Sequence, residues 1–259
     1  MIKKFDTREN IIAWQRFLNT QGESLQTDGK WGPMTKAATG RFQFKRNLTP
    51  DGVVGENTLS AAMQAGFEGF GVGVGHLDSS VLICISAGHT NVPGRDPGVI
   101  ANGLVEGKEA VVVRDHVAAL VRKKDLTVIE DGADGVNDPL SKAIVIAKHS
   151  DLAVEFHLNA APNPTARGVE VLSLPKNRAK AQIIAGAISK ALGIPLRGDR
   201  GWKSDTEGQH SRLAFCREGG GLVAELFFVT NPAEVASYEE NFEALVVALA
   251  DAIAEAAKV

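Results

Sequence analysis

Val81-Leu82-Ile83-Cys84-Ile85 is a run of apolar residues, and Ser86-Ala87-Gly88-His89 follows it directly. An apolar run of this length is typical of a strand that is buried on both faces of a sheet. Similar runs come later in the chain, at residues 127–129, 152–156, 168–172 and 221–226. We therefore expect a series of short buried strands in this part of the chain.

Helical patterns alternate with these strands. They cover residues 106–123, 141–148, 179–192 and 239–257. We expect the charges of the first helix, Arg114 among them, to lie on its solvated face. Strands that alternate with helices of this length predict an α/β fold, in which helices flank both faces of a mostly parallel, twisted sheet.

Polar side chains stand at the ends of three predicted strands. His89 follows the first strand, His157 ends the strand at 152–156, and Glu225 lies near the end of the last. Ligands gather at the carboxyl ends of parallel strands, so these side chains should meet at one rim. Glu106, which opens the first helix, adds a second glutamate. Two histidines and two glutamates suit a hydrolytic zinc site, with three ligands, an open position for water and a spare carboxylate for protons.

Glycine is dense before the first strand, with five glycines in residues 66–75. Glycine at that density destabilises helices and strands, so we expect a flexible linker over residues 66–80. This linker would join a small domain, residues 1–65, to a larger domain, residues 81–259.

The small domain contains an internal repeat. Asp28-Gly29-Lys30-Trp31-Gly32-Pro33-Met34-Thr35 and Asp51-Gly52-Val53-Val54-Gly55-Glu56-Asn57-Thr58 share the pattern DGxxGxxT. Asp-Gly favours a tight turn, and a helix is expected to open after each turn. Ile11, Trp14 and Leu18 mark an earlier helix by their spacing. The pattern predicts three short helices joined by Asp-Gly loops.

Gln15 precedes the first of these repeats, and the pair Phe42-Gln43 lies between them. With this set of motifs the small domain resembles the peptidoglycan-binding domain at one end of many cell-wall hydrolases. The resemblance implies that the domain binds peptidoglycan. We expect the Asp-Gly turns to be structural, and the exposed surface beside them to contact the polymer through Trp31, Arg41 and Gln43.

Five motifs follow one another in the larger domain: Gly88-His89, Asp96-Pro97-Gly98, Gly103-Leu104-Val105-Glu106, His157-Leu158-Asn159-Ala160 and Ala224-Glu225-Leu226-Phe227-Phe228-Val229-Thr230-Asn231. In this ordered set the domain resembles the zinc-dependent N-acetylmuramoyl-L-alanine amidases of bacterial autolysins and phage endolysins. The resemblance implies that His89, Glu106 and His157 bind Zn²⁺ and that Glu225 is the catalytic carboxylate. Asn159 either contacts the substrate as an oxyanion donor or holds the strand end.

Two positions depart from the pattern of that family. Thr90-Asn91 replaces a second glycine after the first histidine, and Glu155 replaces a serine two residues before His157. Glu155 and His157 point to the same face of a strand, so Glu155 is expected to approach the metal or to brace a ligand. Glu109, one helical turn beyond Glu106, is a rival metal ligand.

Composition narrows the classes of function. A net charge of −3 without interleaved aromatic and basic residues does not favour nucleic acid, and no apolar run approaches the roughly 18 residues that cross a bilayer. Two cysteines do not make a disulfide scaffold. The first residues lack the apolar stretch of a secretory signal. We therefore expect a protein made in the cytoplasm without membrane insertion. The resemblance to endolysins implies that it is made in the host and released to the wall, and we expect a monomer.

The resemblance to the amidases implies a cell-wall hydrolase that cleaves the amide between N-acetylmuramic acid and L-alanine with zinc-activated water. Glu225 would accept the proton of the water and return it to the leaving amine. Three alternatives stay open: a zinc peptidase that cuts within the stem peptide, a wall-binding protein without catalysis, and a glycosidase. The last would need two facing carboxylates, such as Glu106 and Glu225.

Overall fold

The computed structural model describes residues 8–67, 81–124, 126–133, 136–207 and 213–259. The chain divides into two compact units, Met1–Ser79 and Ser80–Val259. Most of the predicted linker, residues 68–80, lies outside the described residues. No helix in the described parts of the chain is long and apolar enough to cross a membrane.

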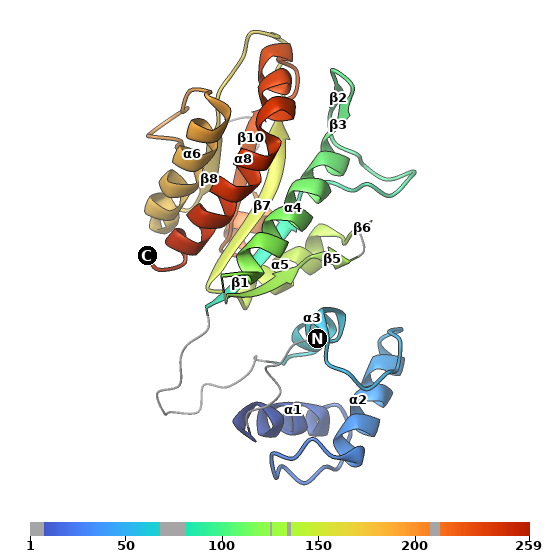
Figure 1. The fold of residues 1–259 in the computed structure, drawn as a ribbon. Helices are drawn as coiled ribbons and strands as arrows, with labels where there is room; N and C mark the ends of the chain where they lie inside the picture. The colour runs from blue at the N-terminus through green and yellow to red at the C-terminus, as the bar shows by residue number, and fades with distance from the viewer. Residues whose placement is uncertain (1–7, 68–80, 125, 134–135, 208–212) are drawn as a thin grey trace. The chain divides into compact units, whose positions relative to one another are not determined.

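The described residues of the N-terminal unit form three helices (Figure 1). Aromatic side chains pack between these helices. The helices are α1 (Arg8–Thr20), α2 (Pro33–Lys45) and α3 (Glu56–Gln64). Trp14 is fully buried, and its ring centroid lies 5.2 Å from that of Phe17 and 6.0 Å from that of Phe42. Its Nε1 donates a hydrogen bond to Thr39 Oγ1 (2.9 Å). A buried tryptophan with its N–H satisfied ties α1 to α2.

The core extends to Phe67, which the sequence assigns to the linker. Phe67 is 3% exposed, and its ring centroid lies 5.3 Å from that of Trp14 and 5.0 Å from that of Phe17. The free energy gained by burying this ring against two other rings exceeds the conformational entropy that the residue loses when it is ordered. Residues 66 and 67 therefore belong with the helices, and the predicted start of the linker at residue 66 is corrected.

A buried glutamine from the preceding helix holds each Asp-Gly loop. In the first repeat, Gln15 Nε2 donates to Asp28 Oδ1 (3.0 Å) and to Thr35 Oγ1 (3.1 Å). The backbone N–H of Gly29 donates to Gln15 Oε1 (3.0 Å). Both ends of the amide are therefore used inside the loop, as a buried polar side chain requires.

Gln43 makes the same contacts in the second repeat. Its Nε2 donates to Asp51 Oδ1 (2.8 Å) and to Thr58 Oγ1 (2.9 Å), and its Oε1 accepts from the backbone N–H of Gly52 (2.8 Å). Gln43 is only 2% exposed. The prediction that Gln43 lies on the exposed binding surface is therefore wrong, because its amide is occupied by the loop that it holds.

The glycines of the two loops are fixed by backbone geometry. Gly29 has φ +72° and Gly52 has φ +68°, in the left-handed region that favours glycine. A Cβ atom on Gly29 would lie 2.7 Å from the carbonyl oxygen of Arg8, and one on Gly52 would lie 2.8 Å from that of Lys36. Each loop thus packs directly against the backbone of a preceding helix.

A six-stranded sheet with the order β4-β1-β7-β10-β8-β9 forms the centre of the C-terminal unit. The strands are β1 (Leu82–Ala87), β4 (Thr127–Glu130), β7 (Leu152–Asn159), β8 (Glu170–Ser173), β9 (Trp202–Ser204) and β10 (Leu222–Phe228). Strands β4, β1, β7 and β10 are parallel, whereas β8 runs antiparallel to β10 and parallel to β9. The predicted mostly parallel sheet is confirmed.

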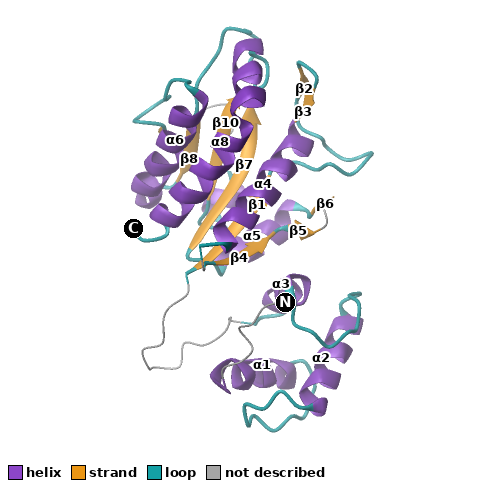
Figure 2. Ribbon diagram, in the orientation of Figure 1, coloured by secondary structure: helices purple, strands orange, loops and turns teal. Residues whose placement is uncertain are grey.

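Helices cover both faces of this sheet (Figure 2). On one face lie α4 (Glu106–Arg122), α6 (Arg178–Leu192) and α8 (Pro232–Ala256), where α8 packs between the other two (Figure 1). On the other face lie α5 (Leu140–Lys148) and the short α7 (Ala214–Arg217), which contact each other. The apolar core lies between the sheet and the α4, α6 and α8 layer, and includes Phe156 and Phe227.

Local signals explain where the elements differ from the prediction. Helix α8 begins at Pro232, because the side chain of Asn231 accepts hydrogen bonds from the backbone N–H groups of Ala233 and Glu234. Its backbone leaves helical geometry at Asn241 (φ −110°, ψ 18°), close to where the predicted helix starts. The two-residue strands β2 (Ile100–Ala101), β3 (Leu104–Val105), β5 (Gly132–Ala133) and β6 (Val136–Asn137) are too short for a sequence pattern to predict.

Candidate active site

His89, Glu106 and His157 meet at the carboxyl-end rim of the sheet. His89 follows β1, Glu106 is the first residue of α4, and His157 lies in β7. His89 Nε2 is 3.2 Å from Glu106 Oε1, and His157 Nδ1 is 3.1 Å from the same oxygen. One ligand atom from each residue lies within 4.8 Å of the others. Three residues far apart in the sequence therefore present two imidazole nitrogens and one carboxylate oxygen to a common point.

This donor set fits zinc. Hydrolytic zinc sites use histidine and carboxylate ligands and keep one position open. The side chain of Glu106 is only 3% exposed, and its ion pairs among the described residues are with the two histidines. A divalent cation would supply the positive charge that a buried carboxylate needs.

Two glycines of the predicted motifs make room for these side chains. A Cβ atom on Gly88 would lie 2.2 Å from Cε1 of His157. One on Gly98 would lie 2.5 Å from Glu106 Oε2 and 2.8 Å from the ring of His89. His89 itself has φ 58°, a conformation that is uncommon outside glycine and recurs at functional sites. Side-chain space at the site requires both glycines, and the left-handed backbone at Gly98 (φ +72°) favours glycine there as well.

The three groups are strongly coupled electrostatically. Burial opposes the charged form of His157, but hydrogen bonds to Glu106 and Glu155 raise its pKa well above the ordinary value. A hydrogen bond to Glu106 also raises the pKa of His89. Burial favours the neutral form of Glu106, yet the two histidines hold its pKa well below the usual range. Glu106 is therefore an anion, which is the form that binds a metal.

Glu225 lies beside this cluster on β10, opposite His157 of β7 and Glu170 of β8. Its Oε2 is shielded from solvent and has no hydrogen-bond partner among the described residues. Burial raises the pKa of Glu225 to about 7, against the attraction of His157. A carboxyl group that titrates near neutral pH can both accept and donate a proton.

Asn159 is engaged at the end of β7. Its Nδ2 donates to Glu170 Oε1 (3.0 Å), and its Oδ1 accepts from the backbone N–H of Ala160 (2.8 Å). Glu170 in turn pairs with Lys203 Nζ at 2.6 Å. These contacts favour the structural alternative for Asn159, and its contact with substrate stays a prediction.

The rival residues have other partners. Glu109 Oε2 accepts a hydrogen bond from the hydroxyl of Tyr238 (2.9 Å), and Glu109 is not part of the three-residue cluster. Glu155 Oε1 lies 3.1 Å from Nε2 of His157. Thr90, which stands where the family has a glycine, donates its backbone N–H to the carbonyl of Asp96 (3.1 Å). Glu155 is thus the only one of these side chains that contacts the cluster among the described residues.

Arg114 is buried, contrary to the prediction that it lies on a solvated helix face. It is 0% exposed, and its Nη1 lies 3.2 Å from Asp131 Oδ1 and 2.9 Å from Asn137 Oδ1. Burial raises the pKa of Asp131 to about 7, although Arg114 opposes this shift. The helical pattern could not indicate this burial, because the acidic partner, Asp131, belongs to a different element and follows strand β4.

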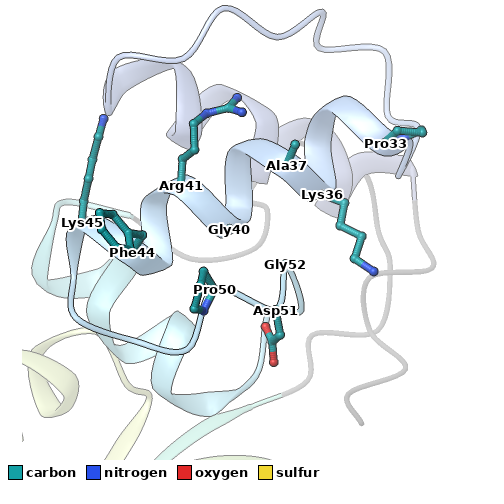
Figure 3. Close-up of a pocket in the computed structure, with 10 residues that line it drawn as sticks. All are labelled: Pro33, Lys36, Ala37, Gly40, Arg41, Phe44, Lys45, Pro50, Asp51 and Gly52. Carbon is teal, nitrogen blue, oxygen red and sulfur yellow. The ribbon is translucent and has the colours of Figure 1, made fainter.

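Arg41 lines an open groove of about 790 Å³ on the N-terminal unit. Residues of α2 form one side of this groove and residues of the second Asp-Gly loop form the other (Figure 3). The lining residues are Pro33, Lys36, Ala37, Gly40, Arg41, Phe44, Lys45, Pro50, Asp51 and Gly52. Arg41 also pairs with Glu23 (3.0 Å). Trp31, another predicted contact, is half-buried and is not among the residues that line the groove.

Sequence profiles of two families match the chain. The profile of the N-acetylmuramoyl-L-alanine amidases matches residues 83–258, which include the three-residue cluster and Glu225. The chain belongs to this amidase family. The profile of a peptidoglycan binding domain matches residues 7–62 of the same chain.

Solved structures of other amidases resemble the C-terminal unit. A chain from Neisseria meningitidis, assigned as an N-acetylmuramoyl-L-alanine amidase, is 42% identical, with a TM-score of 0.62; the match covers 68% of this amidase and 95% of that chain. The catalytic domain of CwlV, an amidase from Bacillus (Paenibacillus) polymyxa var. colistinus, is 21% identical over 69% of this chain and 99% of its own, with a TM-score of 0.58.

The catalytic domain of the CD27L endolysin, which targets Clostridia difficile, is also 21% identical, with a TM-score of 0.54. That match covers 68% of this amidase and 97% of the endolysin domain, and at this identity it shows the fold alone. A comparison with curated proteins gave no match.

Proposed function

We propose that this amidase hydrolyses the bond between N-acetylmuramic acid and L-alanine in peptidoglycan, with Zn²⁺ held by His89, Glu106 and His157. The convergence of both histidines on one oxygen of Glu106 carries the proposal. Membership of the amidase family supports the substrate class. The peptidoglycan binding domain on the same chain supports the polymer as target.

When bound, zinc supplies Lewis acidity to the scissile carbonyl and to the attacking water. Glu225 accepts the proton of that water at Oε2, the carboxylate oxygen without a partner among the described residues. It then returns the proton to the amine of L-alanine as the amide bond breaks. The pKa of about 7 that burial gives Glu225 suits both transfers, because neither protonation state is strongly favoured at neutral pH.

End-group analysis of digested peptidoglycan tests the proposed reaction. The amidase releases free L-alanine amino groups and leaves the glycan intact. New amino groups on other stem residues would identify a peptidase, and new reducing ends would identify a glycosidase. Zinc measured in the purified protein, with loss of wall turbidity that a chelator abolishes, would exclude a wall-binding protein without catalysis.

We also propose that the groove beside α2 binds the wall polymer. Lys36, Arg41 and Lys45 stand along this groove. In Figure 3 the charged ends of Arg41 and Lys45 point away from the Asp-Gly loop, and Arg41 pairs with Glu23. The positive charge of Lys36 and Lys45 at the edges of the groove suits the carboxylates of stem peptides. Phe44 is 73% exposed at the same groove and offers an apolar face for a sugar or a methyl group. Arg41, one of the predicted substrate contacts, is part of this surface.

Binding to sedimented cell walls tests the groove. The double variant Lys36→Ala/Lys45→Ala and the single variant Phe44→Ala should each weaken binding by roughly tenfold, because each removes about 1–2 kcal/mol of charge or aromatic contact. Arg16→Ala is the matched control, since Arg16 is an exposed cation of α1 outside the groove. Equal losses in the control and the groove variants would show a non-specific charge effect and contradict the assignment.

We further propose an endolysin role, in which a monomer made in the host cytoplasm reaches the wall after the inner membrane opens. The pairing of a wall-binding unit with an amidase supports this role, because binding raises the local concentration of the catalytic unit on an insoluble polymer. Expression in bacteria with and without a co-expressed membrane pore tests it. Lysis that depends on the pore is expected, and lysis without it would contradict this role.

A further inference from the structure

Each histidine of the cluster contacts a second carboxylate through its other ring nitrogen. His157 faces Glu106 through Nδ1 (3.1 Å) and Glu155 through Nε2 (3.1 Å). His89 faces Glu106 through Nε2 (3.2 Å) and Asp96 through Nδ1 (3.3 Å). Asp96 and Glu155 therefore each contact the ring nitrogen that faces away from Glu106.

The geometry assigns the two nitrogens of His157 different roles. A neutral imidazole has one N–H and one lone pair, and a metal ligand must direct its lone pair to the metal. Nδ1 is the nitrogen that faces Glu106 and His89, so with zinc bound the lone pair would be on Nδ1. The proton would then be on Nε2, where Glu155 Oε1 would accept it. Glu155 therefore contacts the nitrogen that does not face the metal site.

Glu155 is itself held from behind. It is 5% exposed, and its Oε2 lies 3.1 Å from the hydroxyl of Ser86 on the neighbouring strand. Ser86 Oγ also lies 2.7 Å from Asp131 Oδ2, and the other oxygen of Asp131 pairs with the buried Arg114 (3.2 Å). This row of contacts fixes the carboxylate of Glu155 against rotation, as outer partners of a metal ligand require.

The same arginine also supports the first histidine. Arg114 Nη1 donates to Asn137 Oδ1 (2.9 Å), and Asn137 Nδ2 donates to the backbone carbonyl of His89 (2.7 Å). His89 is the residue with φ 58°, so this contact helps to hold a strained backbone. One buried cation thus connects to both histidines, to His157 through Glu155 and to His89 through Asn137.

We propose that Glu155 is a positioning residue that keeps the proton of His157 on Nε2 and directs Nδ1 to zinc, with Ser86, Asp131 and Arg114 as its buried anchor. The proposal rests on the proposed zinc function. The buried carboxylate of Glu155 has the ring of His157 as one partner and shares the hydroxyl of Ser86 with Asp131 as the other.

Zinc affinity, measured by competition with a chromophoric chelator, is the first test. Glu155→Ser should bind zinc roughly 10- to 100-fold more weakly than the wild type. Glu155→Gln keeps an oxygen that accepts the Nε2–H but loses the charge, so its affinity should lie between the two. Ser86→Ala, which removes only the anchor, should weaken binding in the same direction by a smaller factor. Glu109→Gln is the matched control and should bind zinc as the wild type does.

The protonation of the ring is the second test, and a merely structural role would not change it. Nitrogen-15 spectra of the zinc-loaded protein should show His157 coordinated through Nδ1, with a slowly exchanging proton on Nε2. In Glu155→Ser this proton should exchange faster. Thermal unfolding of each variant shows whether it is folded before these measurements are compared.

Two results would overturn the proposal: wild-type zinc affinity in folded Glu155→Ser and Ser86→Ala, or coordination of His157 through Nε2. Failure of the proposed function has a different signature, because the wild type itself would then bind no zinc or release no L-alanine amino groups. If the wild type binds zinc and cleaves the wall, and the Glu155 variants bind zinc equally well, only the positioning role of Glu155 is refuted.

Discussion

Replacement of Glu225 by glutamine is expected to slow peptidoglycan hydrolysis by roughly 100- to 10,000-fold, the usual contribution of a general acid–base residue. Glutamine has nearly the same shape but cannot accept the proton of water or return it to the leaving amine. Glu225 is also not part of the His89, Glu106 and His157 cluster. The variant should therefore bind as much zinc as the wild type while its turnover is lost.

The measurement combines the release of L-alanine amino groups with zinc analysis of the same samples. Glu109→Gln serves as the control, because Glu109 is a glutamate on α4 whose partner is Tyr238. It should keep wild-type turnover. If Glu225→Gln cleaves the wall at the rate of this control, Glu225 is not the proton carrier.

The substitution Gly88→Ala should have an effect of similar size for a steric reason. The new Cβ atom would lie 2.2 Å from Cε1 and 2.3 Å from Nε2 of His157, so the ring must move. The ring cannot move without leaving Glu106 Oε1, which it meets at 3.1 Å. Since a displacement of about 1 Å can cost roughly 100-fold in rate, activity should fall by at least that factor and zinc affinity should fall with it.

Gly186→Ala is the matched control for this change. Gly186 lies within α6, and a Cβ atom there would meet nothing within 4 Å. Alanine favours a helix over glycine by about 0.5–1 kcal/mol, so this variant should be as stable as the wild type or more stable. A Gly88→Ala protein with unchanged zinc content and activity would show that His157 is not held where the structure has it.

The parts of the fold that depend on local pattern could be predicted from the sequence. The strand from residue 152 and the helix from Glu106 have long apolar periodicity, and the structure has β7 (Leu152–Asn159) and α4 there. The antiparallel direction of β8 could not be predicted, because its apolar run is the same in either direction. It depends on how the chain returns to the sheet edge.

The site could be predicted as a set of residue types but not as a geometry. Glu155 and His157 share a strand face, so their contact follows from alternation. The contact of Arg114 with Asp131 joins a helix to the end of another strand, and no spacing within either element predicts it. Gln43 shows the opposite error: a polar side chain near a glycine turn suggests exposure, but the turn itself buries the amide.

The two glutamine-held loops differ in one respect that has a practical consequence. Gln15 lies 13 residues before its aspartate and Gln43 only 8 residues before its own, yet both make the same hydrogen bonds. The number of residues between the glutamine and the aspartate can therefore differ while the same hydrogen bonds form. Foreign peptides grafted at the exposed residues 26 and 27 of the longer connection, beyond the Asn19–Leu25 and Arg41–Glu23 contacts, should leave the three-helix module folded. They offer a place to retarget the enzyme to other cell surfaces.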